Sequence, residues 1–219
     1  MTSVAALVAA VVCLSIAPYS ARLTRTVPDR ENRRWYVGAG VSRTVLGATA
    51  AVSVVLGLLA GAAARWSAVL PAYVVLAAVS VVLVVVDVAH HRLPNRVLYP
   101  GAVASAVLLA VAAAVQHDWW DVLRAGEAAG AVYVVFFVLA LISPRSLGMG
   151  DVRLAALLGA YLGFRSWPLV YLGLLAGFVV AAVIAVVLLA ARRATRTTAL
   201  PFGPALILGT LLVLAATHP

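Results

Sequence analysis

Long apolar runs constrain this chain more than any other feature. Stretches of about 20 apolar residues follow one another through the sequence and are separated by short polar breaks. A helix needs about 20 such residues to cross the ~30 Å hydrocarbon core of a bilayer. The residues are 65% hydrophobic and only 11% charged, and a soluble domain of this length cannot bury that much apolar surface. We therefore predict an all-α fold, a polytopic transmembrane helical bundle in contact with membrane lipids.

The polar breaks divide the chain into about eight predicted spans. The spans are expected at 4–20, 45–64, 67–87, 97–115, 126–143, 152–164, 167–190 and 202–217. The sixth is short, and the sequence leaves open whether it is a partial or a tilted element. Because no long polar segment interrupts the spans, residues 1–219 are expected to form a single integral-membrane domain.

The arginines predict the orientation of the spans. All sixteen basic residues are Arg, and the break at 21–44 is taken as a short cytoplasmic loop. Alternation then places three more breaks on the same side, at 88–96, 144–153 and 191–201. Thirteen arginines lie inside, and the three outside are Arg65, Arg124 and Arg165. Such an excess marks the cytoplasmic side, so we expect a multi-pass protein of the cell membrane with its N-terminus outside.

The net charge of +9 comes from these arginines. A strongly basic chain can also indicate binding to nucleic acid. Here the arginines serve better as topology signals, and no nucleic-acid partner is expected.

Two of the seven acidic residues stand apart from the rest. Asp87 follows an apolar run at the inner end of the third span, and Asp151 opens the sixth span from the same side. Ionisable residues at the margin of the hydrocarbon are costly and usually mark a function. The alternative is that each is an ordinary interfacial cap, a role that suits Asp151 at a helix N-terminus. The other five are expected to be solvated or structural: Asp29, Glu31, Asp118, Asp121 and Glu127.

Two facing carboxylates are suited to hydrolysis. They tend to share one proton, so that the ionised group takes a proton from water while the protonated group binds a scissile carbonyl. No metal and no cofactor are expected. Gly148 and Gly150 permit unusual dihedrals and close approach of a substrate backbone. Because a helix N-terminus favours negative charge, we expect Asp151 to be the ionised base and Asp87 to carry the proton.

Three ordered segments carry a family resemblance. They are "GMGDVRLAALLGAYLG", which contains Asp151, "DVAHHRLPN" from Asp87, and "PFGPALILG" from Pro201. Together they span 87–209, and the chain resembles the type IV prepilin peptidases, which are integral-membrane aspartic proteases with a GxGD motif. The resemblance implies that Asp87 and Asp151 are the catalytic pair and that the substrates are prepilin or pseudopilin precursors, cut at the cytoplasmic face. The residues expected to shape the site or bind substrate are Gly148, Gly150, Arg153, Pro94, Asn95, Pro201, Gly203 and Pro204.

The sequence departs from the family pattern at two places. Arg153 stands where the family usually has Lys, which keeps the charge but changes the geometry of the donors. Many members also carry paired CxxC motifs after the first span and methylate the new N-terminus. Cys13 is the sole cysteine of this chain, so N-methyltransferase activity is not expected.

Three other interpretations remain open. A protease of the presenilin or signal-peptide-peptidase type would share the GxGD motif but cut inside transmembrane helices. A small proton- or cation-coupled transporter would place carboxylates nearer the middle of the membrane, on broken helices. A catalytically dead scaffold for pilus assembly is the third. His90 and His91, next to Asp87, are expected to be interfacial residues and not metal ligands.

Overall fold

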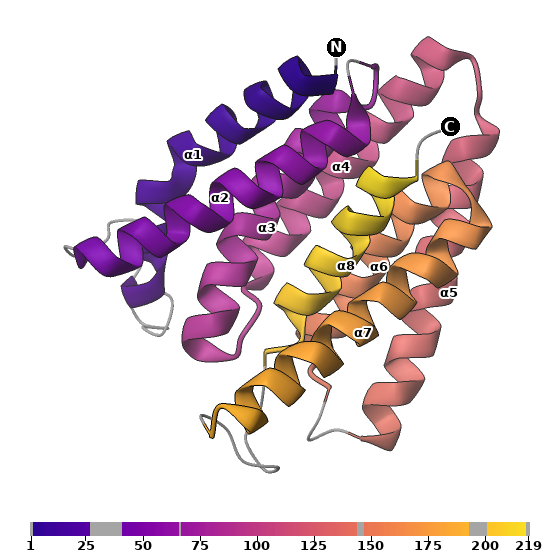
Figure 1. Cartoon of the computed structure of the whole chain (residues 1–219). Helices are drawn as coiled ribbons and strands as arrows, with labels where there is room; N and C mark the ends of the chain where they lie inside the picture. Colours follow the sequence, from indigo (N-terminus) through magenta and orange to yellow (C-terminus); the bar gives the residue numbers. More distant parts are fainter. Residues whose placement is uncertain (1, 27–40, 66, 144–146, 193–200, 218–219) are drawn as a thin grey trace. The chain divides into compact units, whose positions relative to one another are not determined.

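Eight helices make up nearly all of the described residues. A computed structural model describes residues 2–26, 41–65, 67–143, 147–192 and 201–217 (Figure 1). The helices are α1 (Thr2–Thr26), α2 (Arg43–Ala64), α3 (Leu70–His90), α4 (Asn95–Gln116), α5 (Trp120–Ile142), α6 (Met149–Arg165), α7 (Trp167–Ala190) and α8 (Gly203–Ala216). Within these ranges there is no strand. The predicted all-α class is confirmed, and each predicted span corresponds to one helix.

Six of the helices in the described part of the chain, α1 to α5 and α7, are long and apolar enough to cross a membrane. α6 has 17 residues and α8 has 14. At 1.5 Å per residue, α6 is about 25 Å long, somewhat less than the ~30 Å of a hydrocarbon core. The polytopic transmembrane bundle is confirmed, and the sixth span is a complete but short helix.

The helices group into two compact units. The first is Met1–His117 with Thr217–Pro219, and the second is Asp118–Ala216. In the first unit α1 packs on α2 and α3, α2 packs on α3, and α4 packs on α3. In the second unit α5 packs on α6, α7 packs on α8, and α6 also contacts α7 and α8. The expectation of one continuous domain stays a prediction.

Glycines let paired helices approach closely. In α2, a Cβ added at Gly57 would lie 2.5 Å from the Cα of Ala10 in α1, and one added at Gly61 would lie 2.5 Å from the Cα of Ala6. α5 and α6 meet in the same way at Gly159 and Gly163 of α6, and α7 and α8 meet at Gly177 and Gly209. Small residues four apart are typical of helix pairs in membranes, where close packing replaces the hydrophobic effect as the force that joins helices.

Several helix boundaries differ from the predicted spans. α1, for example, runs to Thr26 and not to residue 20. α5 begins at Trp120 and not near 126, because its polar first turns are stabilised by Asp118, whose Oδ1 accepts from the Trp120 N–H over 3.0 Å. α3 continues to His90, so Asp87 lies one turn inside the helix and not at its end. Hydropathy marks where a helix leaves the apolar region, whereas capping contacts decide where it stops.

Candidate active site

Asp87 is buried near the C-terminal end of α3. The residue is 5% exposed. Its backbone carbonyl oxygen accepts a hydrogen bond from the backbone N–H of His91 over 2.7 Å. His91 adopts a left-handed conformation, with φ 50° and ψ 42°, which ends the helix. Close by in the sequence, Val82 and Val86 pack with Leu23 of α1 in a buried apolar cluster. The position of Asp87 is therefore set by the last turn of α3 and by the packing of that turn on α1.

The segment after Asp87 is a tight connection between two helices. Pro94 is the N-cap of α4, with φ −71° and ψ 115°, and its carbonyl accepts from the N–H groups of Val97 and Leu98 at 3.0 and 3.1 Å. Asn95, the first residue of α4, is exposed. Proline suits this place because its fixed φ prepares the chain for a helix without sacrificing an internal hydrogen bond. The "LPN" segment thus turns the chain directly from α3 into α4.

Asp151 lies in the first turn of α6. Its Oδ2 accepts a hydrogen bond from the backbone N–H of Gly148, the N-cap residue, over 3.2 Å. In return the Gly148 carbonyl accepts from the N–H groups of Asp151 and Val152, at 3.0 and 3.3 Å. Asp151 is half-buried and Gly148 is exposed. The carboxylate caps its own helix, as the interfacial interpretation expected, and its other side remains within reach of solvent.

Neither glycine before Asp151 has a positive φ. Gly148 has φ −81° and ψ 154°, which any residue can adopt, and no glycine in the described residues has a positive φ. A Cβ at Gly148 would lie 3.6 Å from Asp151 Oδ2, in ordinary contact with the carboxylate. The expectation of unusual dihedrals at Gly148 is wrong, and a Cβ would fit there without displacing the carboxylate. Arg153 follows two residues after Asp151 and is half-buried.

The "PFGP" segment begins α8. Pro201 is half-buried, and Gly203 is buried as the first residue of the helix. Pro204 occupies the first turn, where a missing N–H removes no intrahelical hydrogen bond. The Phe202 carbonyl accepts from the Leu206 N–H over 3.2 Å.

Phe202 itself was not predicted to matter. Its ring lies 5.2 Å from that of Phe178 in α7 and 6.4 Å from that of Phe136 in α5, measured between centroids. Beside these rings is an open apolar groove of about 340 Å³. The groove is lined by Phe178, Ala181, Ala182, Ile184, Ala185, Pro201, Phe202 and Ala205. An apolar residue between prolines carries no signal in the sequence, so only the packing of three helices reveals this cluster.

The candidate residues fall in both units. Asp87, Pro94 and Asn95 belong to the first, whereas the GxGD segment and the PFGP segment belong to the second. The second unit therefore joins α6 and α8, two of the three motif-bearing elements, which contact each other directly. Within the described ranges, no three His, Cys, Asp or Glu side chains are placed to hold a metal ion.

Comparisons with known proteins agree with these motifs. The model of the type IV leader peptidase family matches residues 74–186, a range that includes Asp87, Pro94 and Asp151. The prepilin leader peptidase/N-methyltransferase of Stutzerimonas stutzeri is 30% identical over 121 residues, which cover 54% of this chain and 40% of that protein. No solved structure matches the chain. Because the family model covers just over half of the sequence, including both aspartates, this chain belongs to the type IV leader peptidase family.

Proposed function

We propose that this protein is a membrane-embedded aspartic endopeptidase that removes leader peptides from prepilin-like precursors at the cytoplasmic face. The observation that carries the proposal is the setting of Asp151. It lies in the first turn of α6, follows Gly148 and Gly150, accepts a hydrogen bond from the N-cap residue with one oxygen and falls within the family match. Asp87, buried one turn before the end of α3 that the arginines assign to the cytoplasm, is the second acid.

The proposed chemistry divides the work between the two carboxylates. Asp151, ionised at the N-terminus of α6, takes a proton from water, and the resulting hydroxide attacks the scissile carbonyl. Asp87, protonated near the C-terminus of α3, donates a hydrogen bond to the carbonyl oxygen and then its proton. Asp151 then gives the proton it took from water to the leaving amine, and the peptide C–N bond breaks. As the new carboxyl group forms, Asp87 takes back a proton from the hydroxyl group of the intermediate. General acid–base catalysis of this kind contributes about 10²–10⁴-fold for each group.

The charges around the aspartates support a cytoplasmic site. Arg92 and Arg96, which flank the connection after Asp87, are exposed, as is Arg22 near the end of α1. Arginines in short loops favour the cytoplasmic side. A leader peptide that remains on that side would meet the inner ends of α3 and α6.

We do not extend the proposal to methylation. The name of the Stutzerimonas stutzeri relative includes an N-methyltransferase activity, but the alignment leaves most of that protein uncovered. Cys13, the only cysteine in the sequence, is buried within α1. The proposed activity is therefore cleavage alone.

The test is cleavage of a synthetic prepilin-like peptide by the purified protein in proteoliposomes. Asp87→Asn and Asp151→Asn should each abolish cleavage, because Asn keeps the size of the side chain but cannot exchange a proton. The double variant should be no worse than either single one, since the two groups act as a unit. Asp118→Asn and Glu127→Gln, in α5 or just before it, are the matched controls and should cleave normally.

The products separate this function from its rivals. Mass spectrometry should locate one cut at the junction between the leader and the apolar segment. Cuts inside the apolar segment would favour a presenilin-type protease instead. A wild-type protein that inserts correctly and cleaves nothing would favour a transporter or a scaffold.

A further inference from the structure

α6 is short, and its far end needs hydrogen-bond partners. The last carbonyl groups of any helix lack partners within the helix, and leaving such groups unpaired in a membrane is costly. α6 ends at Arg165, and after Ser166, whose backbone is extended at φ −174° and ψ 157°, the chain turns directly into α7. The carbonyls of the last turn therefore have to be satisfied by another element.

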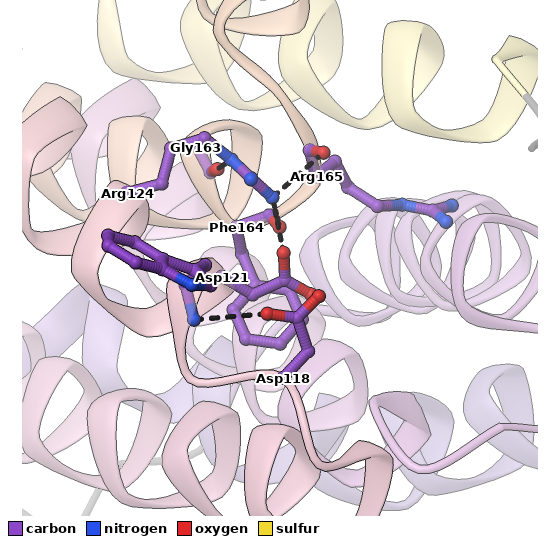
Figure 2. A network of polar contacts seen from close by, with 7 residues as sticks. Asp118, Asp121, Arg124, Gly163, Phe164 and Arg165 are labelled. Carbon is purple, nitrogen blue, oxygen red and sulfur yellow. Dashed lines mark hydrogen bonds and ion pairs between the residues drawn. The ribbon is translucent and has the colours of Figure 1, made fainter.

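Arg124 of α5 supplies those hydrogen bonds. Its Nε donates to the Gly163 carbonyl over 2.6 Å, and one terminal nitrogen donates to the carbonyls of Phe164 and Arg165 over 2.6 and 3.1 Å. The same nitrogen lies 2.5 Å from Oδ1 of Asp121. Figure 2 shows the guanidinium directed toward this row of carbonyl oxygens, with the Asp121 carboxylate beside it. One side chain thus binds three consecutive carbonyl groups at the end of α6, which lie 39–41 residues later in the chain.

The charges in this network suit both helix ends. A cation is favourable at the C-terminus of α6, and an anion is favourable in the first turn of α5, where Asp121 lies. The side chains of Arg124 and Asp121 are only 26% and 19% exposed. The guanidinium is partly buried and donates through two of its nitrogens to backbone carbonyls, so it fixes geometry in a way that a single surface ion pair does not.

Close packing holds the same ends of α5 and α6 together. A Cβ at Gly163 would overlap that of Ala128 and would lie 3.0 Å from the Arg124 carbonyl oxygen. One turn earlier, a Cβ at Gly159 would lie 3.0 Å from Val132. α6 can therefore neither slide along α5 nor rotate against it without breaking these contacts. Asp151 lies twelve residues before Gly163 on the same helix, or about 18 Å away along its axis.

We propose that Arg124 is a positioning residue for Asp151. By clamping the last three carbonyls of α6, it sets the height of α6 against α5 and therefore the depth at which Asp151 meets the substrate. The catalytic part of this inference rests on the proposed function, whereas the mechanical part concerns α6 alone.

Kinetics test the catalytic part. Arg124→Met removes all donors while keeping a long side chain, and its kcat should fall about tenfold to a hundredfold, the size expected for a displacement of about 1 Å. KM should stay within about twofold, because Arg124 is placed far from the substrate. Arg124→Lys keeps the charge but not the fork of donors and should recover part of kcat. Glu127→Gln, which removes a charge about one turn further along α5, is the control and should leave kcat unchanged.

A distance measurement tests the mechanical part without using activity. In a Cys13→Ala background, spin labels at Leu123→Cys and Met149→Cys, both exposed positions, report the height of α6 along α5. Arg124→Met should shift or broaden this distance, and Arg124→Lys should do so less. A second label pair, at Leu172→Cys and Leu212→Cys on α7 and α8, should not change.

The outcomes separate the two claims. A lower kcat with an unchanged 123–149 distance would overturn the positioning role, as would a normal kcat in Arg124→Met. If the wild-type protein cleaves no prepilin-like peptide, the proposed function fails, but the distance still decides whether Arg124 holds α6 in place.

Discussion

The Oδ2 atom of Asp151 accepts a hydrogen bond from the backbone N–H of Gly148, 3.2 Å away. Asp151, the proposed base, therefore also helps to cap its own helix. Because one oxygen is engaged with the backbone, the carboxylate is held in a single orientation before any substrate arrives. Stability and activity should respond differently to changes at this position.

Asp151→Asn should leave stability almost unchanged, because the amide oxygen can still accept from Gly148. Asp151→Ala should lose the hydrogen bond from the Gly148 N–H and with it about 0.5–1.5 kcal/mol. Neither variant should cleave, because neither side chain can exchange a proton. Thermal unfolding in detergent, measured beside peptide cleavage, checks both effects, and retained cleavage in Asp151→Ala would remove Asp151 from the mechanism.

Gly163→Ala should destabilise the α5–α6 pair. The added methyl group would overlap the Cβ of Ala128, and overpacking typically costs about 1–3 kcal/mol. Gly130→Ala in α5 is the matched control, because an added Cβ there meets nothing within 4 Å, and it should leave the unfolding temperature the same or higher. Equal unfolding temperatures for the two variants would contradict the close packing of α5 on α6.

Reporter fusions should place the 21–44 and 191–201 loops in the cytoplasm. The reason is that thirteen arginines fall on the predicted cytoplasmic side and three on the predicted outer side. A fusion at His117, between α4 and α5, is the opposite control and should report the outside. A reporter signal from outside the cell at either predicted cytoplasmic loop would reverse the topology and separate the two aspartates from the cytoplasmic substrate.

A mature pilin processed by this protein alone should carry an unmethylated N-terminus. The expectation follows from the missing cysteine framework, since Cys13 stands alone in the sequence. Mass spectrometry of the pilin from a host that lacks every other such enzyme makes the measurement. An N-methylated product in that host would show that the chemistry needs no CxxC motifs.

In the proposed mechanism the carboxyl proton should reside mainly on Asp87. Asp151 lies at the positive end of the α6 dipole, whereas Asp87 lies one turn before the negative end of the α3 dipole. Isotope-edited infrared spectroscopy near neutral pH should show a protonated carboxyl band that disappears in Asp87→Asn. A band that persists there and is lost in Asp151→Asn would reverse the two roles. A pH–rate profile alone cannot make this assignment, because a coupled pair titrates as one unit.

The eight helices and the chain order of the three motifs could be predicted from the sequence. Hydropathy marks the spans because the bilayer demands length and apolarity from each segment on its own. The positions of Asp87 and Asp151 near helix ends follow from the same local pattern, and so does the role of Pro94 before α4. These features depend on neighbours within a few residues and need no knowledge of packing.

Tertiary structure decided the features that join distant residues. The sequence presents Arg124 as one of three arginines on the outer side, and nothing local indicates that its guanidinium binds the carbonyls of Gly163, Phe164 and Arg165. Likewise, nothing local to Phe202 indicates that its ring contacts those of Phe136 in α5 and Phe178 in α7. The contacts of Arg124 arise because a membrane contains no water to satisfy the end of a short helix, so the partner must come from another part of the chain. For Arg124 and for Phe202 alike, only packing determines which residues meet.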